Sequence, residues 1–138
     1  MKKIFVIIIF LFSSSFIFAQ SEVKKHPIDV WMDECLQTNQ TTAGMINCAD
    51  KAYKKWDVEL NKVYKELMTL LDEDSQKKLK DSQKAWIKFR DEEFKLLASF
   101  YAKKEGTMYI PMQLFDKVEI LKNRVIELDG HLQIMKDM

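Results

Sequence analysis

The sequence predicts an all-α protein, an antiparallel bundle of three long helices plus one short N-terminal helix tied to it by a disulfide. Three observations predict this fold class. Only three glycines and two prolines occur in 138 residues, and lysine, glutamate, leucine and methionine, which favour helices, are frequent. Beyond the first 25 residues, apolar side chains recur every three or four positions, the period of helices with one buried face. Both cysteines follow an apolar leader.

The first 19 residues have the features of a secretory signal peptide. Lys2 and Lys3 precede a mostly apolar run over residues 4–18, and Ala19 offers a small residue for cleavage before Gln20. An uncleaved membrane anchor is the alternative, but this run of about 15 residues contains three serines and is shorter than the roughly 20 that a spanning helix needs. We therefore expect cleavage after Ala19, a single domain over residues 20–138, a periplasmic or secreted location, and no membrane contact after cleavage.

The charge balance argues against a nucleic-acid partner. The full chain has 22 basic and 21 acidic residues, and the leader contains two lysines and no acid, so the net charge after cleavage is −1. Nucleic-acid binding needs a concentrated basic surface, which these totals do not indicate. A chain of this length builds one hydrophobic core.

The two cysteines, Cys35 and Cys48, are predicted to form a disulfide. Exported proteins meet an oxidising compartment, where paired cysteines are the rule. The bond would close a loop of about 14 residues and contribute about 3 kcal/mol. A metal site is the rival interpretation, but it needs more ligands, and His26 and His131 stand near opposite ends of the mature sequence, where we expect them to be solvated. No metal or cofactor is expected.

The helices can be assigned in order along the chain. Pro27 fits the first position of a short helix of about ten residues. Thr41 or Thr42 caps the second helix, which is expected to run through Leu71. The acidic turn at residues 72–75 starts the third helix, which ends near residue 104. The apolar residues that mark this third helix are Leu79, Ala85, Trp86, Phe89, Leu96, Leu97 and Phe100.

A loop over residues 105–109 is expected before the fourth helix. Pro111 is predicted to begin that helix, and the helical pattern weakens at Gly130. Its expected buried stripe consists of Met112, Phe115, Val118, Leu121, Val125 and Leu128.

Polar residues beside the apolar stripes of the second and third helices predict a hydrogen-bonded network. Arg90 is expected to meet Asp57 or Asp91, while Gln83 and Asn61 close the network. A structural ion pair that fixes helix register is favoured over a polar binding site, because buried charges must be paired and no histidine lies nearby for acid–base chemistry. The predicted members are Asp57, Asn61, Tyr64, Gln83, Trp86, Arg90 and Asp91.

The sequence lacks the parts of a catalytic site. A disulfide leaves no free thiol, no serine has an evident histidine partner, and metal-binding motifs are absent. Recognition surfaces are the remaining candidates, and two are predicted. One is the acidic turn of Asp72, Glu73 and Asp74; the other is the loop of Gly106, Thr107, Met108 and Tyr109. The loop's apolar side chains are either exposed for a partner or folded back over the bundle end.

These residues together resemble a known family. The blocks are Cys35 and Met45-x-x-Cys48, then Trp56-Asp57-x-Glu59-Leu60-Asn61-x-x-Tyr64, then Leu79-Lys80-x-Ser82-Gln83-x-Ala85-Trp86-Ile87-x-Phe89-Arg90-Asp91, then Gly106-Thr107 and Arg124-x-x-x-Leu128. In order and spacing they resemble the lysozyme inhibitor LprI-type family over nearly the whole mature chain. The resemblance implies a small, exported, helical, non-catalytic domain. Family members often carry a second cysteine pair, and this chain has Phe94 and apolar residues in that region instead.

Two functional hypotheses follow. The first is a binding protein that inhibits lysozyme or a related cell-wall hydrolase; many lysozymes are basic, so an acidic tip would speed association. The alternative is a structural or assembly module of the envelope that docks partner proteins. A small-molecule carrier is less favoured, because three tryptophans at core positions indicate a filled interior.

Overall fold

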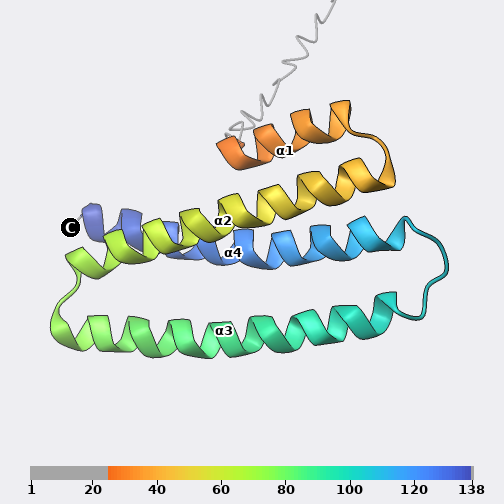
Figure 1. The fold of residues 1–138 in the computed structure, drawn as a ribbon. Coiled ribbons are helices and arrows are strands. Elements are labelled where there is room, and N and C mark those ends of the chain that lie inside the picture. Colours follow the sequence, from red (N-terminus) through yellow and green to blue (C-terminus); the bar gives the residue numbers. More distant parts are fainter. Residues whose placement is uncertain (1–24, 138) are drawn as a thin grey trace, which may run out of the picture.

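The computed structural model describes residues 25–137, which form a bundle of helices (Figure 1). The short α1 spans Pro27–Thr38, and three long helices follow: α2 Thr42–Leu70, α3 Glu73–Tyr101 and α4 Tyr109–Lys136. Successive helices run antiparallel, and no strand occurs in this part of the chain. The predicted fold class is confirmed. The predicted signal peptide lies outside the described residues.

Side chains cap the first three helices. His26 accepts a hydrogen bond from the Ile28 N–H at Nδ1 (3.2 Å), so the histidine rather than solvent satisfies the start of α1. The Thr41 hydroxyl accepts from the Gly44 N–H (3.0 Å), and the Asp72 carboxylate accepts from the Ser75 N–H (2.8 Å). These bonds fix where α2 and α3 begin, as the sequence predicted.

The ends of the last two helices differ from the predictions. The third helix stops at Tyr101 rather than near residue 104, and α4 begins at Tyr109, two residues before Pro111. Between them Gly106 has a φ of 110°, a backbone conformation that favours glycine. The expected weakening at Gly130 is wrong, because α4 continues to Lys136 and buries Leu132.

The core lies mainly between α2 and α4. A stripe of side chains with at most 4% exposure runs along α2 and faces a matching stripe on α4. Their interdigitated packing is the main apolar burial in the molecule and its main source of stability. The central members are Ala52, Trp56, Leu60, Val63 and Leu67 on α2, with Val118, Leu121, Val125, Leu128 and Leu132 on α4.

The short helix α1 is fastened to the bundle by covalent and polar contacts. None of its residues is fully buried, although Ile28 and Trp31 pack against the core. The predicted disulfide between Cys35 and Cys48 is present. Lys122 of α4 forms an ion pair with Asp29 (2.9 Å).

The third helix packs more loosely than predicted. Only Leu79 is buried, and α3 contacts chiefly α4 (Figure 1). Phe89 is 53% exposed, Leu96 43% and Phe100 52%, so the expectation that the apolar residues of each helix share one buried face is wrong for these three. Ala85 is also exposed, whereas Trp86 and Leu97 are partly buried. The reason is geometric: these three large side chains lie on one flank of α3, beside the narrower stripe that meets α4.

Two further burial predictions are corrected. Met112 is 41% exposed, because helical spacing places it on a different side of α4 from the buried Pro111 and Val118. His26 is half-buried, with its ring 4.4 Å from that of Trp56, so it is not the solvated terminal residue expected. His131 is exposed.

Candidate recognition surfaces

Arg124 on α4 is the centre of the best-satisfied polar cluster. It is 6% exposed. Its guanidinium donates to Gln83 Oε1 (3.1 Å), to the Ser82 hydroxyl (3.0 Å) and to the carboxylate of Glu127 (2.8 Å). It also lies 5.9 Å from the ring of Trp86. The cluster ties α3 to α4, so it acts as a structural connection between the two helices.

The network predicted from the sequence forms only in part. Arg90 pairs with Asp91 (2.7 Å) on its own helix and not with Asp57. Asn61 donates to the backbone carbonyl of Asp57 (2.8 Å), one turn earlier. Gln83 bonds Arg124 instead of Asn61, so the expected closure of the network by Gln83 and Asn61 is wrong.

Asn61, Tyr64 and Gln83 nevertheless border one groove between α2 and α3. The groove has a volume of about 290 Å³ and is completed by Leu60, Lys80, Lys84 and Ile87. Nothing in it pairs an acid with a base or a nucleophile. It is therefore a surface feature of a loosely packed helix pair and offers no catalytic arrangement.

Two of the three carboxylates in the acidic turn are already bonded within the chain. Asp72 caps α3, and the hydrogen bond from the Ser75 N–H lowers the pKa of its carboxyl group. Asp74 forms an ion pair with Lys78 (2.5 Å). Of the three predicted residues, only Glu73 has no such internal partner among residues 25–137.

The turn between α3 and α4 exposes apolar side chains. Met108 is 52% exposed and Ile110 51%. Both side chains are therefore exposed rather than folded back over the end of the bundle. Beside them lies a shallow hollow of about 240 Å³ bordered by Tyr101, Lys104, Gly106, Tyr109 and Ile110 among others. Thr107 is exposed in the same turn.

A hydrogen bond stiffens the base of this turn. The Tyr101 hydroxyl at the end of α3 donates to the carboxylate of Asp116 on α4 (2.5 Å), which raises the pKa of Tyr101. The rings of Tyr101 and Tyr109 lie 6.4 Å apart. The apolar turn is thus presented by two helices that are joined just behind it.

The described part of the chain contains no group of three or more histidine, cysteine or carboxylate side chains that could hold a metal ion. No described helix is both long and apolar enough to cross a membrane. Taken together, these observations define a small helical domain tied by one disulfide.

Comparison with known proteins places this domain in a family. The family model described as "Lysozyme inhibitor LprI" matches residues 33–128, and the chain belongs to that family. No curated protein matches. Among solved structures, an uncharacterised protein from Burkholderia thailandensis is similar, with 29% sequence identity and a TM-score of 0.75 over 82% of this chain. The chain covers 57% of that longer protein.

One structurally important residue was left out of the predicted network. Arg124 was noted only as part of the family pattern, with Leu128 one turn later. Its position three residues from Leu121 and one from Val125 is a signal that could have revealed it, since an arginine on an apolar stripe requires partners.

Proposed function

We propose that this chain is an exported, non-catalytic binding protein that inhibits a lysozyme or related cell-wall hydrolase. Family membership supports the class of target. The disulfide fits an oxidising compartment, which agrees with a periplasmic or secreted protein. In this proposal the turn between α3 and α4 is the part that contacts the hydrolase.

The observation that carries the proposal is the exposure of Met108 and Ile110. More than half of each side chain is open to solvent at the tip of a helical hairpin. Water-exposed apolar side chains grouped beside a hollow are typical of protein interfaces, and methionine is enriched there. Inhibition requires only that such a tip cover or enter a cleft, because no bond is made or broken.

The acidic turn is the weaker candidate for the same role. It stands at the opposite end of α3 from Met108 (Figure 1), and the 29 residues of this helix span roughly 43 Å. One small partner therefore does not cover both turns. Internal bonds of Asp72 and Asp74 further reduce the field that a basic lysozyme would meet.

A lysis assay tests the proposal. The exported protein is titrated against a c-type lysozyme acting on a cell-wall suspension. The double variant Met108→Ser/Ile110→Ser should need at least about tenfold more protein for half-inhibition, which corresponds to a combined loss of about 1.4 kcal/mol of binding free energy. Its matched control is Ile126→Ser/Ile134→Ser, which removes two equally exposed apolar side chains farther along α4.

The control should inhibit as well as the unmodified chain. Equal loss in both variants would mean that inhibition does not depend on the turn. No inhibition by the unmodified chain at large molar excess, or turnover of a cell-wall substrate by it, would contradict the proposed function itself.

A second function, docking of an envelope protein, is supported by a different observation. Phe89, Leu96 and Phe100 form a half-exposed apolar stripe on α3. Crosslinking in intact cells should then recover a specific envelope protein, and Phe89→Ser/Leu96→Ser should abolish the crosslink. Recovery of lysozyme alone would favour the first function.

A further inference from the structure

The side of α2 that is turned away from α4 carries a row of lysines. The buried residues of α2, Trp56 and Leu60 among them, point into the core. Helical spacing places five exposed lysines on the other side, around Val58. These lysines are Lys51, Lys54, Lys55, Lys62 and Lys65, and with Val58 and Trp31 they are called here the basic face.

Most of the charge on this face is not neutralised internally. Lys54 pairs with Asp50 (2.6 Å) and Lys62 with Glu59 (2.9 Å). Lys51, Lys55 and Lys65 form no ion pair within 4.0 Å among residues 25–137. The face therefore has an excess of positive charge along about 21 Å of helix.

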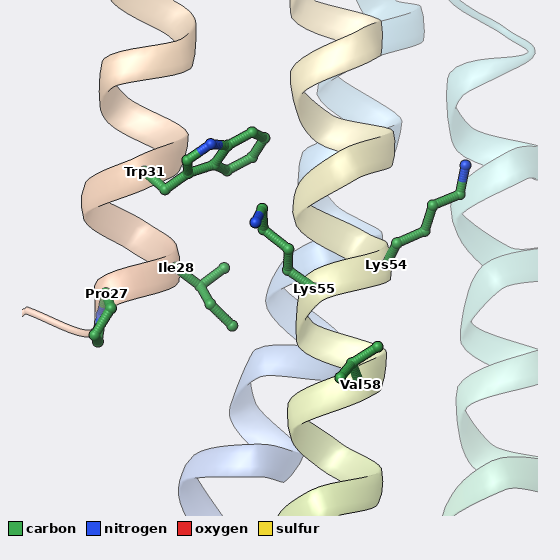
Figure 2. Close-up of a pocket in the computed structure, with 6 residues that line it drawn as sticks. All are labelled: Pro27, Ile28, Trp31, Lys54, Lys55 and Val58. Carbon is green, nitrogen blue, oxygen red and sulfur yellow. The ribbon is translucent and has the colours of Figure 1, made fainter.

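Apolar side chains occupy the middle of the basic face. A shallow groove of about 450 Å³ separates α1 from α2 and is lined by Pro27, Ile28, Trp31, Lys54, Lys55 and Val58 (Figure 2). Val58 is 68% exposed, more than any other large apolar residue of the described chain. The ring of Trp31 extends from α1 toward α2, and the Lys55 ammonium lies 4.8 Å from its centroid (Figure 2).

We propose that the basic face binds the surface of an anionic phospholipid bilayer, with the lysine side of α2 lying on it and Trp31 of α1 at the edge of the contact. The combination of features matches the chemistry of that surface. Lysine ammonium groups are attracted to the phosphate headgroups, and lysine stems lie along the headgroup boundary with their charged ends in water. Val58 and the groove meet the acyl boundary, and tryptophan favours this interfacial depth.

The apolar centre favours lipid over other anionic partners. A hydrophilic acidic polymer would use the lysines alone and leave Val58 and the groove in water. A bilayer uses both, and its flat surface suits a groove that is open and shallow. The binding is peripheral, since no described helix can span a membrane.

This inference revises the expectation of no membrane contact after signal cleavage. That expectation came from the leader, which is shorter than a spanning helix and is expected to be cleaved. The net charge does not reveal the basic face, because it also counts acids outside this face, such as the three on α1. The proposed inhibitory turn lies between α3 and α4 rather than on the basic face. The two proposals therefore concern different surfaces, and each can be tested independently of the other.

Co-sedimentation with vesicles tests the proposal. The protein is purified after export, and its N-terminus is checked by mass. It is then mixed with vesicles of phosphatidylcholine, with or without phosphatidylglycerol. Binding is expected only with phosphatidylglycerol. The variant Lys51→Glu/Lys55→Glu/Lys65→Glu should lower the partition coefficient at least about a hundredfold, since each lysine contributes about fivefold.

The matched control is Lys77→Glu/Lys80→Glu/Lys88→Glu on α3. It changes the net charge equally, also at exposed lysines without ion pairs among the described residues, and should retain most of the binding. Lysozyme inhibition should be the same for the basic-face variant and the unmodified protein, which separates this test from that of the proposed function.

Fluorescence tests the depth of insertion. Brominated phosphatidylglycerol should quench the protein's emission, and Trp31→Phe should remove most of this quenching while Trp86→Phe does not. Val58→Gln should weaken binding about threefold, because it replaces an apolar side chain at the acyl boundary by a polar one. The proposal is overturned by absence of binding to phosphatidylglycerol vesicles, by equal loss in the α3 control, or by binding to soluble polyglutamate without binding to vesicles.

Discussion

Arg124 combines deep burial with three side-chain partners, which makes it the most consequential single polar residue for stability. Its partners on α3, Gln83 and Ser82, lose their hydrogen bonds if it is removed. Arg124→Ala should therefore lower the free energy of unfolding by about 3 kcal/mol, the cost of breaking a buried hydrogen-bonded charge cluster. Urea unfolding with the disulfide intact measures this loss.

Arg90→Ala is the appropriate comparison for Arg124→Ala. Arg90 is also a partly buried arginine, on α3, but its only ion pair among residues 25–137 is with Asp91, the next residue of the same helix. We expect a loss below about 1 kcal/mol. Similar losses in the two variants would show that Arg124 does not connect α3 to α4 as inferred.

The cap of α3 makes stability depend on pH. The Ser75 hydrogen bond lowers the folded-state pKa of Asp72, so its stabilising contribution is present above the unfolded pKa of about 3.9 and is lost as the pH falls through the folded value. Asp72→Asn retains a capping oxygen that does not titrate. The stability of the unmodified protein relative to this variant should decline as the pH is lowered from about 5 to 3. A difference that stays constant over that range would contradict the assignment.

The partial burial of His26 could not be predicted from the sequence near it. The pair His26-Pro27 predicts a helix start, and α1 begins there. The stacking of the imidazole on Trp56 depends on how α1 lies across α2, and no local pattern encodes that contact. Local capping and turn chemistry could thus be read in advance, whereas burial that depends on packing of distant segments could not.

At the scale of elements, α1 depends on its disulfide. It has no fully buried residue, so its apolar contacts alone hold it weakly. Cys35→Ser/Cys48→Ser should cost about 3 kcal/mol. We expect amide hydrogen exchange in residues 28–38 to accelerate far more than exchange in α4. Uniform acceleration along the chain would show that α1 is an integral part of the core.

The third helix should tolerate substitution unevenly. Leu79, 8% exposed, is its buried anchor, and Leu79→Ala should cost about 2–3 kcal/mol. Phe89→Ala, at a position 53% exposed, should cost about 0.5 kcal/mol. Chemical denaturation of the two variants gives both values. A larger loss for Phe89→Ala would mean that a second chain or partner covers the stripe.

The same helix marks the limit of prediction from periodicity. Apolar residues at helical spacing predicted the third helix and the acidic turn predicted its start, and both are confirmed, whereas the helix ends three residues earlier than predicted. Periodicity also suggested that Phe89, Leu96 and Phe100 are buried, but it shows only that they share a flank. Whether a neighbour covers that flank depends on the angle between helices. Likewise, the spacing of the lysines of α2 was sufficient to place them on one face. The near-zero net charge, however, did not indicate a basic surface.

Considered as a whole, the molecule has one well-packed layer, formed by α2 and α4, and two more loosely packed ones, α1 and α3. The stripes of α2 and α4 form the core, while α1 and α3 lie against it with few buried side chains. The proposed recognition surfaces are the stripe on α3, the turn between α3 and α4, and the basic face on the outer side of α2. Stability and recognition are therefore assigned to different faces of the bundle.

This division predicts the order in which the molecule opens. Amides of α2 and α4 near Trp56, Val63, Leu121 and Leu128 should exchange only through global unfolding, because each of these side chains is at most 4% exposed. Amides of residues 85–101, where α3 has no buried side chain, should exchange through local opening. Under native conditions they should exchange at least about a hundredfold faster, which corresponds to about 2.7 kcal/mol.

Native-state hydrogen exchange followed by mass spectrometry resolves these segments, and the measurement is repeated at two protein concentrations. If residues 85–101 exchanged as slowly as α2 at both concentrations, the contacts of α3 within the bundle would be stronger than its exposed side chains imply. If they slowed only at the higher concentration, association of chains through the α3 stripe would account for the protection.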